Sequence, residues 1–315
     1  MELSQLRTLI HVAELGSLSK AADQLHIAQP ALSRQIRMLE AELGVRLFAR
    51  HGRGMLLTDQ GRDVLGHAMR VMAELEEIRA QTSEAEAPLM GRIAIGMPPT
   101  VADIISVPLV TAFETAHPRV MLRLVSAYTG HLLDWLHRGE IDLAVLYDPQ
   151  SARSLRSQPL LHEKLFLIGP SEAGLSSERK FPFNQLAGKR LLLPSPQHGL
   201  RIIVERCAAE AGIALDVAVE ADSLATLKRL VRHGKGWTIL PRAPIHEDIE
   251  AGRLTATALS DPAPGRRLVL SYPADRPLSR LARFAGESVT AIVTDMVQRA
   301  VWAGELPSET GEDGR

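Results

Sequence analysis

Cysteine, aromatic residues and long apolar runs are all scarce in this chain of 315 residues. The one cysteine, Cys207, excludes an intramolecular disulfide framework and fits a reducing compartment. A buried structural thiol is expected there rather than a redox sensor, because no second cysteine or basic cluster lies nearby. No apolar run approaches the ~18 residues of a membrane span, and the N-terminal segment lacks the pattern of a secretion signal. We therefore expect a cytoplasmic protein without membrane contact.

The usual catalytic, cofactor and metal motifs are missing as well. The sequence contains no G-x-S-x-G, G-x-x-x-x-G-K-[ST], G-x-G-x-x-G, H-E-x-x-H or C-x-x-C segment. His131 and His137 are six residues apart, so a helix would place them on different faces and they would make a poor metal pair. We expect neither an enzyme nor a bound cofactor or metal.

What the sequence does contain is an unusual helix over residues 29–43. Its apolar face is formed by Leu32, Ile36, Leu39 and Leu43, at helical spacing. A second face carries Pro30, Ser33, Arg34 and Arg37. Arginine donates two parallel hydrogen bonds to guanine, glutamine does the same to adenine, and serine reaches phosphates or bases. Alone, this pattern is equally typical of any amphipathic surface helix with a polar face.

The flanking segments favour the DNA-reading interpretation. Residues 3–15 form an amphipathic helix that Gly16 ends, and a short helix capped by Ser17 or Ser19 follows. Helix, short helix, tight turn and helix make the helix-turn-helix pattern. Two short strands, at 47–48 and 55–57, enclose a turn with Arg50 and Arg53 and predict a wing that meets phosphate or the minor groove.

The run LSKAADQLHIAQPALSRQIRMLEAELGVRLFARHGRGMLLTDQG resembles the DNA-binding domain of the LysR-type transcriptional regulators. The family often has Ser or Thr where this chain has Ala28, so one capping or phosphate-contacting hydroxyl is absent. The resemblance implies contact with a double-stranded DNA operator through the recognition helix and the wing, at Gln29, Pro30, Ser33, Arg34, Arg37, Arg50 and Arg53. The net charge of −1 argues neither for nor against DNA binding, but residues 34–62 hold six arginines against three acids. Such a modest excess fits a reader that binds as a dimer or larger assembly.

A long helix is predicted from Thr58 to Thr82, with Thr58 as its N-cap. Its apolar residues follow a heptad seam: Val64, Ala68, Val71, Leu75, Ile78 and Thr82. The seam predicts dimerisation through residues 59–82, with packing on the helix's own domain as the alternative. In LysR-type regulators the matching helix pairs two subunits antiparallel. The polar segment 83–91 is interpreted as a hinge.

From residue 92 strands and helices alternate, which indicates a parallel α/β sheet in two successive halves. We expect an α/β effector domain over 92–303, with lobe one at 92–163 and 268–303, lobe two at 164–267, and a disordered tail at 304–315. The resemblance implies two lobes similar to periplasmic binding proteins, joined to an N-terminal all-α winged helix-turn-helix domain over 1–58.

Ligands of open α/β sheets bind beyond the carboxyl ends of the strands, near helix N-termini. The resemblance points to the loops around Thr100 and Thr129 for a small-molecule effector, expected to be an anionic metabolite. The candidate set from both lobes is Pro99, Thr100, Val101, Thr129, Gly130, Leu146, His198 and Arg201. Plain N-capping explains Thr100, Thr129 and Ser223 equally well, and a solvent-exposed turn explains His198.

The sequence thus predicts a DNA-binding transcriptional regulator whose cleft senses a small molecule. The resemblance implies dimers that associate into homotetramers, cleft closure that changes DNA bending, and contact with RNA polymerase if the protein is an activator. Activation and repression both fit. Two rivals remain: a ligand-binding protein whose N-terminal module contacts only other proteins, and an enzyme that uses the cleft. An effector-free role in organising DNA is also compatible.

Overall fold

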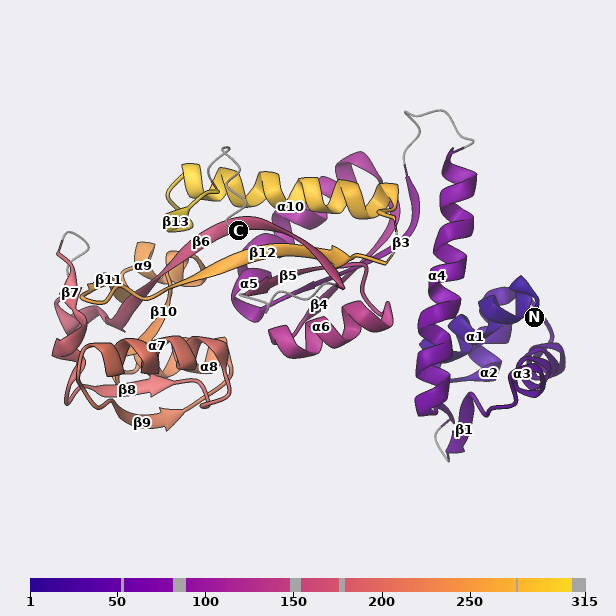
Figure 1. Ribbon diagram of the computed structural model, residues 1–315, viewed down its shortest axis with the longest axis horizontal. Helices are drawn as coiled ribbons and strands as arrows, with labels where there is room; N and C mark the ends of the chain where they lie inside the picture. The colour runs from indigo at the N-terminus through magenta and orange to yellow at the C-terminus, as the bar shows by residue number, and fades with distance from the viewer. Residues whose placement is uncertain (52–53, 82–88, 148–153, 176–178, 276, 308–315) are drawn as a thin grey trace.

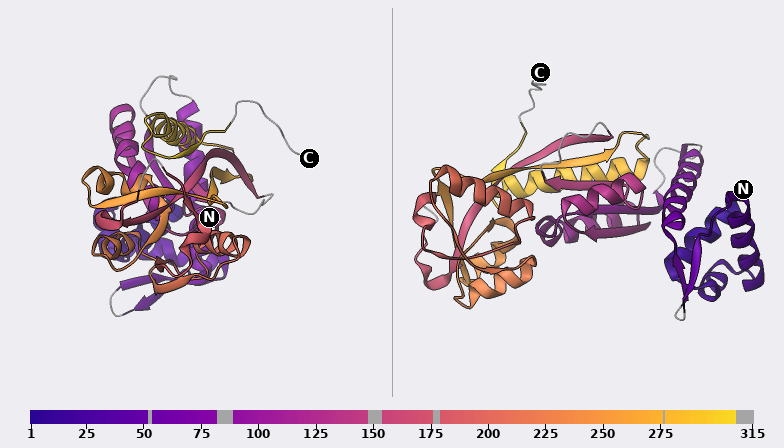
Figure 2. Two further views of the ribbon diagram at one scale, coloured as in Figure 1. Left: turned by 90° about the vertical axis from the view of Figure 1, so that its left-hand side faces the viewer. Right: turned by 60° about the horizontal axis from the view of Figure 1, so that its bottom comes forward.

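The computed structural model describes residues 1–51, 54–81, 89–147, 154–175, 179–275 and 277–307. A small N-terminal domain, one long helix and a larger C-terminal region follow one another along the longest axis of the molecule (Figure 1). The right-hand view of Figure 2 separates the N-terminal domain from the two lobes of the C-terminal region. No helix in the described ranges has the length and apolarity to cross a membrane.

The N-terminal domain is built from three helices and a hairpin: α1 (Leu3–Leu15), α2 (Leu18–Leu25), α3 (Gln29–Leu43), β1 (Phe48–His51) and β2 (Gly54–Leu57). Ser17 caps α2 by accepting a hydrogen bond from the Lys20 amide, and Pro30 stands in the first turn of α3. The apolar face expected on α3 is buried at Leu32, Ile36 and Leu39, which pack with α1 and α2. The two strands pair antiparallel, with Phe48 opposite Leu57.

The long helix is α4 (Asp59–Gln81), and the Thr58 hydroxyl caps it by accepting from the Gly61 amide at 2.9 Å. The predicted seam is buried in its first part and exposed farther along. Val64 and Ala68 pack into the core of the N-terminal domain, whereas Val71 and Ile78 are exposed. The N-terminal end of the helix therefore packs on its own domain, as the alternative expected, and apolar residues are exposed farther along.

Lobe one begins with β3 (Met90–Met97), α5 (Pro99–Ala116), β4 (Arg119–Ser126), α6 (Thr129–Arg138) and β5 (Leu143–Tyr147). It is completed by β12 (Gly265–Pro273), α10 (Arg280–Gln298) and β13 (Gly304–Glu305). Pro99 occupies the first turn of α5, and Pro108 lies in the helix interior. The Ser106 hydroxyl donates to the Ala102 carbonyl at 2.5 Å in that turn.

Lobe two consists of strands with α-helices and 3₁₀ turns between them. Its strands are the last part of β6 (Leu155–Pro170), then β7 (Phe181–Pro182), β8 (Arg190–Leu193), β9 (Asp216–Glu220), β10 (Thr238–Pro241) and β11 (Leu254–Ser260). Its helices are α7 (Gly199–Glu210), α8 (Leu224–Arg232) and α9 (His246–Glu250), with a 3₁₀ turn at Phe183–Leu186. Strand β11 has the sequence LTATALS, in which alternating Thr and Ala residues leave no apolar run.

The sheet is mixed rather than parallel. Strand β3 pairs parallel with β4 and β5, and β11 pairs parallel with β7. In contrast, β12 pairs antiparallel with β5, and β10, β11 and β12 all pair antiparallel with β6. Strand β6 belongs to both lobes. Its first part pairs with β12 in lobe one, and residues from Leu165 on pair with β10 and β11 in lobe two. One sheet thus continues through both lobes of the described chain.

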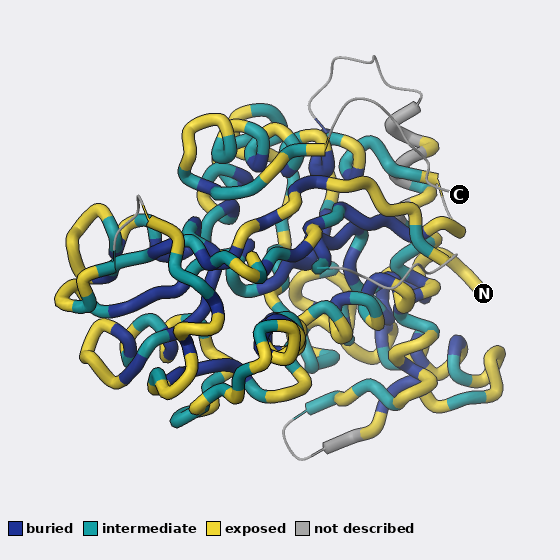
Figure 3. The backbone as a smooth tube through the Cα atoms, turned by 60° about the vertical axis from the view of Figure 1, so that its left-hand side comes forward, coloured by how far each residue is buried: buried dark blue, intermediate teal, exposed yellow. Residues whose placement is uncertain are grey.

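The two lobes have separate apolar cores, visible as buried segments along the central strands (Figure 3). The lobe-one core uses residues between Ile93 and Leu161 and between Leu268 and Trp302, with Ala243 added from lobe two. The lobe-two core uses residues between Leu165 and Leu259. The chain crosses from one lobe to the other at Lys164–Leu165 and again before β12, and the Leu165 amide donates to the Pro264 carbonyl at 3.1 Å.

Two boundary expectations differ from the structure. The expected hinge at 83–91 falls mostly outside the described residues, but Met90 and Gly91 already belong to β3. The expected tail began at residue 304, yet Gly304 and Glu305 form β13 against β6. Residues 308–315 of that tail lie outside the described part of the chain.

Candidate functional site

Helix α3 presents the polar face that the sequence predicted. Gln29, Pro30, Arg34 and Arg37 are exposed and Ser33 is half-buried. Within the described residues, neither Arg34 nor Arg37 has a hydrogen bond or ion pair. The Gln29 side chain accepts a hydrogen bond from the Ser19 hydroxyl at 3.2 Å, which ties the start of α3 to α2. The two guanidinium groups are therefore available to an anionic partner.

Gln35, another polar residue of α3, forms a hydrogen bond inside the domain. Gln35 accepts a hydrogen bond from the Thr8 hydroxyl of α1, so it holds α1 against α3 instead of pointing outward. Glu40 accepts from the Leu47 and Phe48 amides at 2.8 and 3.3 Å and anchors the start of the wing. Arg50 is in strand β1, and Arg53 lies outside the described residues.

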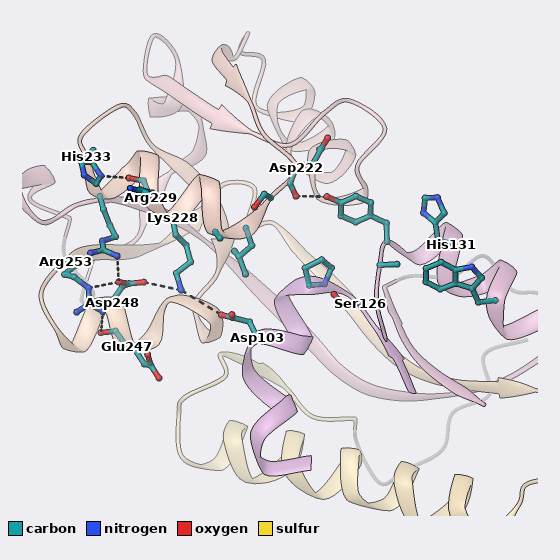
Figure 4. Close-up of a pocket in the computed structure, with 18 residues that line it drawn as sticks. Asp103, Ser126, His131, Asp222, Lys228, Arg229, His233, Glu247, Asp248 and Arg253 are labelled. Atoms are coloured by element: carbon teal, nitrogen blue, oxygen red, sulfur yellow. Dashed lines mark hydrogen bonds and ion pairs between the residues drawn. The ribbon is translucent and has the colours of Figure 1, made fainter. Parts of the chain in front are cut away.

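The second candidate site is a cleft of about 1380 Å³ between the lobes. Helices α5 and α6 and the end of β4 supply one wall, and α8, α9 and the turn before β11 supply the other (Figure 4). Its lining residues are Pro99, Asp103, Ser126, Ala127, Tyr128, His131, Trp135, Asp222, Ser223, Leu224, Ala225, Lys228, Arg229, Arg232, His233, Glu247, Asp248 and Arg253. Of the residues predicted for effector binding, only Pro99 lines this volume.

The basic residues on one wall of the cleft come mainly from α8. Asp248 is buried and holds three of the cleft's cations, Lys228 at 3.2 Å, Arg253 at 2.7 Å and Arg232 at 3.7 Å. Burial raises the pKa of Asp248, but hydrogen bonds from Arg253 and Lys228 outweigh burial and lower it. Arg229 is exposed and has no such partner among the described residues. The segment KRLVR at residues 228–232 indicates this basic face in the sequence, but the candidate effector residues did not include it.

Two contacts hold the walls of the cleft together. The Tyr128 hydroxyl of lobe one donates to the Asp222 carbonyl of lobe two at 2.6 Å (Figure 4). Lys228 of lobe two lies 3.9 Å from the Asp103 carboxylate of lobe one. Hydrogen bonds from the Ser195 amide and hydroxyl to the Asp222 carboxylate lower the pKa of Asp222. The Asp222 carboxylate is therefore bonded within lobe two, while the Asp222 backbone carbonyl accepts the hydrogen bond from Tyr128.

Beside the cleft, residues from distant parts of the sequence form a polar junction. The Arg266 guanidinium donates to Glu163 at 2.6 Å and lies 3.4 Å above the Tyr147 ring. The Tyr147 and Thr100 hydroxyls are 3.0 Å apart, and burial raises the pKa of the Tyr147 phenol. Trp302 donates from its indole to Glu163 at 2.7 Å. Every member of this junction is thus bonded to another.

The other predicted effector residues have varied positions. Thr100 joins the polar junction, and Thr129 accepts from the Tyr147 amide at 3.4 Å. Gly130 is exposed, with open space where a side chain would stand. Val101 and Leu146 are both fully buried in apolar cores, so their side chains do not face the cleft.

The two predicted effector residues of lobe two, His198 and Arg201, have different surroundings. His198 caps α7 through its Nδ1, and its ring lies edge-on to Tyr128 at 4.8 Å. Burial first, then the charge of Arg266, lowers the pKa of His198. Arg201 is buried and bonds to Glu205, the Pro194 carbonyl and Glu220 inside lobe two. The expectation that Arg201 adds charge to the cleft is therefore wrong, because its guanidinium stabilises α7 against β8 and β9.

Among the described residues, no group of three or more His, Cys, Asp or Glu side chains is arranged to hold a metal ion.

Comparison with known proteins identifies the family. Residues 3–62 match the bacterial regulatory helix-turn-helix protein family of lysR type, and residues 86–290 match the LysR substrate binding domain. The chain belongs to the LysR family of transcriptional regulators. It is a DNA-binding regulator with an effector-binding domain, and its family members are transcription factors rather than enzymes.

Individual relatives of this LysR-type regulator match along nearly the whole chain. The transcriptional regulator BbuR of Bordetella bronchiseptica is 30% identical and covers 96% of this chain and 94% of its own. A probable hydrogen peroxide-inducible genes activator of Streptomyces viridosporus is 34% identical and covers 85% and 87%. A full-length OxyR variant from Pseudomonas aeruginosa shares the fold, with a TM-score of 0.76, 24% identity and coverage of 98% and 99%.

Proposed function

We propose that this regulator reads an operator through Gln29, Pro30, Ser33, Arg34 and Arg37, with Arg50 and Arg53 holding the DNA backbone or minor groove. The observation that carries the proposal is the exposed face of α3, on which two arginines lie without protein partners. An unpaired guanidinium on a helix beside a wing is suited to guanine or phosphate. A regulator of bacterial DNA acts where the chromosome lies, so the cytoplasm is the proposed location.

The proposed assembly is a dimer formed through α4 and a tetramer formed through the effector domains. Val71 and Ile78, both exposed on α4, supply apolar surface for the dimer. Dimerisation would place two recognition helices on successive major grooves. In the activating case the same assembly would also contact RNA polymerase.

The proposed effector is a small anion bound between the lobes. Helices α5 and α6 begin at the cleft side of lobe one, and helix N-termini favour negative charge. Arg229 adds a cation without a protein partner from the opposite wall. Such a ligand shifts DNA affinity only if it binds the two arrangements of the protein with different affinity.

Fluorescence anisotropy with DNA from just upstream of the protein's own gene tests the DNA half of the proposal. We expect binding that outlasts random competitor DNA, with log K falling steeply as log salt rises. A panel of small carboxylates and phosphate esters added to the same assay tests the effector half. Binding no better than to random DNA, at that site and at genome-selected sites, would contradict operator recognition. A ligand that the protein chemically alters would support the enzyme rival.

Peroxide is not expected to switch this protein, although relatives are named as peroxide-inducible activators. A disulfide needs two cysteines, and the chain has Cys207 alone. That thiol is only 5% exposed, and burial raises its pKa, which disfavours the reactive thiolate. Adding a few equivalents of hydrogen peroxide should leave operator affinity unchanged in wild-type protein and in Cys207→Ser. A peroxide response that Cys207→Ser abolishes would contradict this expectation.

A further inference from the structure

Helix α6 contacts a different part of the protein at each end. At its N-terminal end, Tyr128 bonds to the Asp222 carbonyl of lobe two, and its ring contacts His198 of the same lobe. Any opening or closing of the cleft therefore moves the partners of Tyr128. The contacts at this end of α6 therefore depend on the relative position of the two lobes.

The C-terminal end of α6 rests on α4. The Arg138 carbonyl, in the last turn of α6, accepts a hydrogen bond from the Arg70 guanidinium of α4 at 3.3 Å. Gly66 of α4 is buried against the same carbonyl, and a Cβ on Gly66 would stand 2.1 Å from its oxygen. Glycine inside a helix costs about 1 kcal/mol relative to alanine, so its presence here is explained by this close approach.

The part of α4 that α6 touches is also part of the DNA-binding core. Val64, Leu65 and Ala68 flank Gly66 and pack with α1 and the other buried residues of the N-terminal domain. Glu14 of α1 also forms an ion pair with Arg92 of β3, the strand that begins lobe one. These contacts hold the DNA-binding domain to lobe one, and one of them is made by the end of α6 (Figure 1).

We propose that α6 positions the DNA-binding domain according to the state of the cleft, with Tyr128 as its input and the Arg138–Gly66–Arg70 contact as its output. A ten-residue helix is about 15 Å of hydrogen-bonded backbone, so a shift at one end is carried to the other. The proposal rests on effector control for its biological signal, but the mechanical link is tested without any effector.

The test is a double-mutant cycle between the two ends of α6. Tyr128→Phe removes the hydroxyl that bonds to lobe two, and Arg70→Ala or Gly66→Ala changes the contact with α4. Operator affinity is measured by anisotropy, and hydrogen exchange is measured over residues 59–72. Tyr128→Phe should change operator Kd by about two- to tenfold and alter exchange in α4. In the Arg70→Ala and Gly66→Ala backgrounds, the same substitution should change neither.

Two matched variants control for substitutions that merely perturb a helix. Arg299→Ala removes an exposed arginine from the C-cap of α10, and Ala209→Ser adds one heavy atom at an exposed position of α7. Tyr128→Phe should retain its full effect in both backgrounds. Circular dichroism identifies a variant that fails to fold. If Gly66→Ala fails to fold, the Arg70→Ala background alone provides the test. No effect of Tyr128→Phe, or the same effect in every background, would overturn the proposal. Loss of operator discrimination in wild-type protein would instead contradict the proposed function.

Discussion

Arg34→Ala should markedly reduce the discrimination between operator and random DNA. If the guanidinium makes a bidentate contact with guanine, its loss costs about 1–3 kcal/mol of specific binding. Random DNA offers mainly phosphate contacts, so affinity for it should fall much less. Anisotropy with the operator and with a scrambled sequence of the same length, at matched salt, gives the ratio directly.

The matched control is Arg206→Ala, which removes an exposed arginine from α7 in the effector domain. It changes the net charge by the same amount but should leave both affinities and the salt dependence unchanged. An operator-to-random ratio that stays at the wild-type value in Arg34→Ala would exclude a base contact by this residue. An equal fall in both affinities would reassign Arg34 to phosphate.

Glu163→Gln should cause the largest loss of stability among simple substitutions in the effector domain. Glu163 is 1% exposed, and its carboxylate accepts hydrogen bonds from Arg266 and Trp302. Removing its charge breaks the ion pair between two side chains that are both almost fully buried, Glu163 and Arg266, at a cost of about 3–5 kcal/mol. Urea unfolding followed by tryptophan fluorescence, with Trp302 close to the change, measures the difference.

Glu305→Gln provides a control in the neighbouring strand. Glu305 also pairs with a cation, Lys164 at 2.8 Å, but both side chains are more than half exposed. Solvent screening makes such a pair weak, so little change in stability is expected. Similar unfolding curves for the two variants would show that the Glu163–Arg266 pair contributes no more than a surface pair.

The DNA-binding face could be predicted from the sequence because its determinants are local. Leu32, Ile36 and Leu39 lie within two turns of Arg34 and Arg37, so one periodic pattern specifies both the buried and the exposed side. The caps at Ser17 and Thr58 are equally local. Such features need no knowledge of the tertiary fold.

The cleft could be predicted only in outline because its contacts are distant in sequence. Glu163 and Arg266 are 103 residues apart, and Tyr128 and Asp222 are 94 apart. Strand-end reasoning located the loops at Thr100 and Thr129, but it could not distinguish a cleft residue from a core residue such as Val101 or Leu146. Arg201 shows the same limit, since burial inside lobe two depends on how α7 packs.

The two chain crossings between the lobes restrict how the cleft can open. They run side by side, and the Leu165 amide is hydrogen-bonded to the Pro264 carbonyl where they pass. Two adjacent chain connections that are hydrogen-bonded to each other resist twisting and sliding of the lobes far more than bending. The lobes are therefore confined to one principal direction of rotation, whatever molecule occupies the space between them. Residues lining the cleft can then change with the ligand while the movement delivered to the DNA-binding domain keeps the same direction.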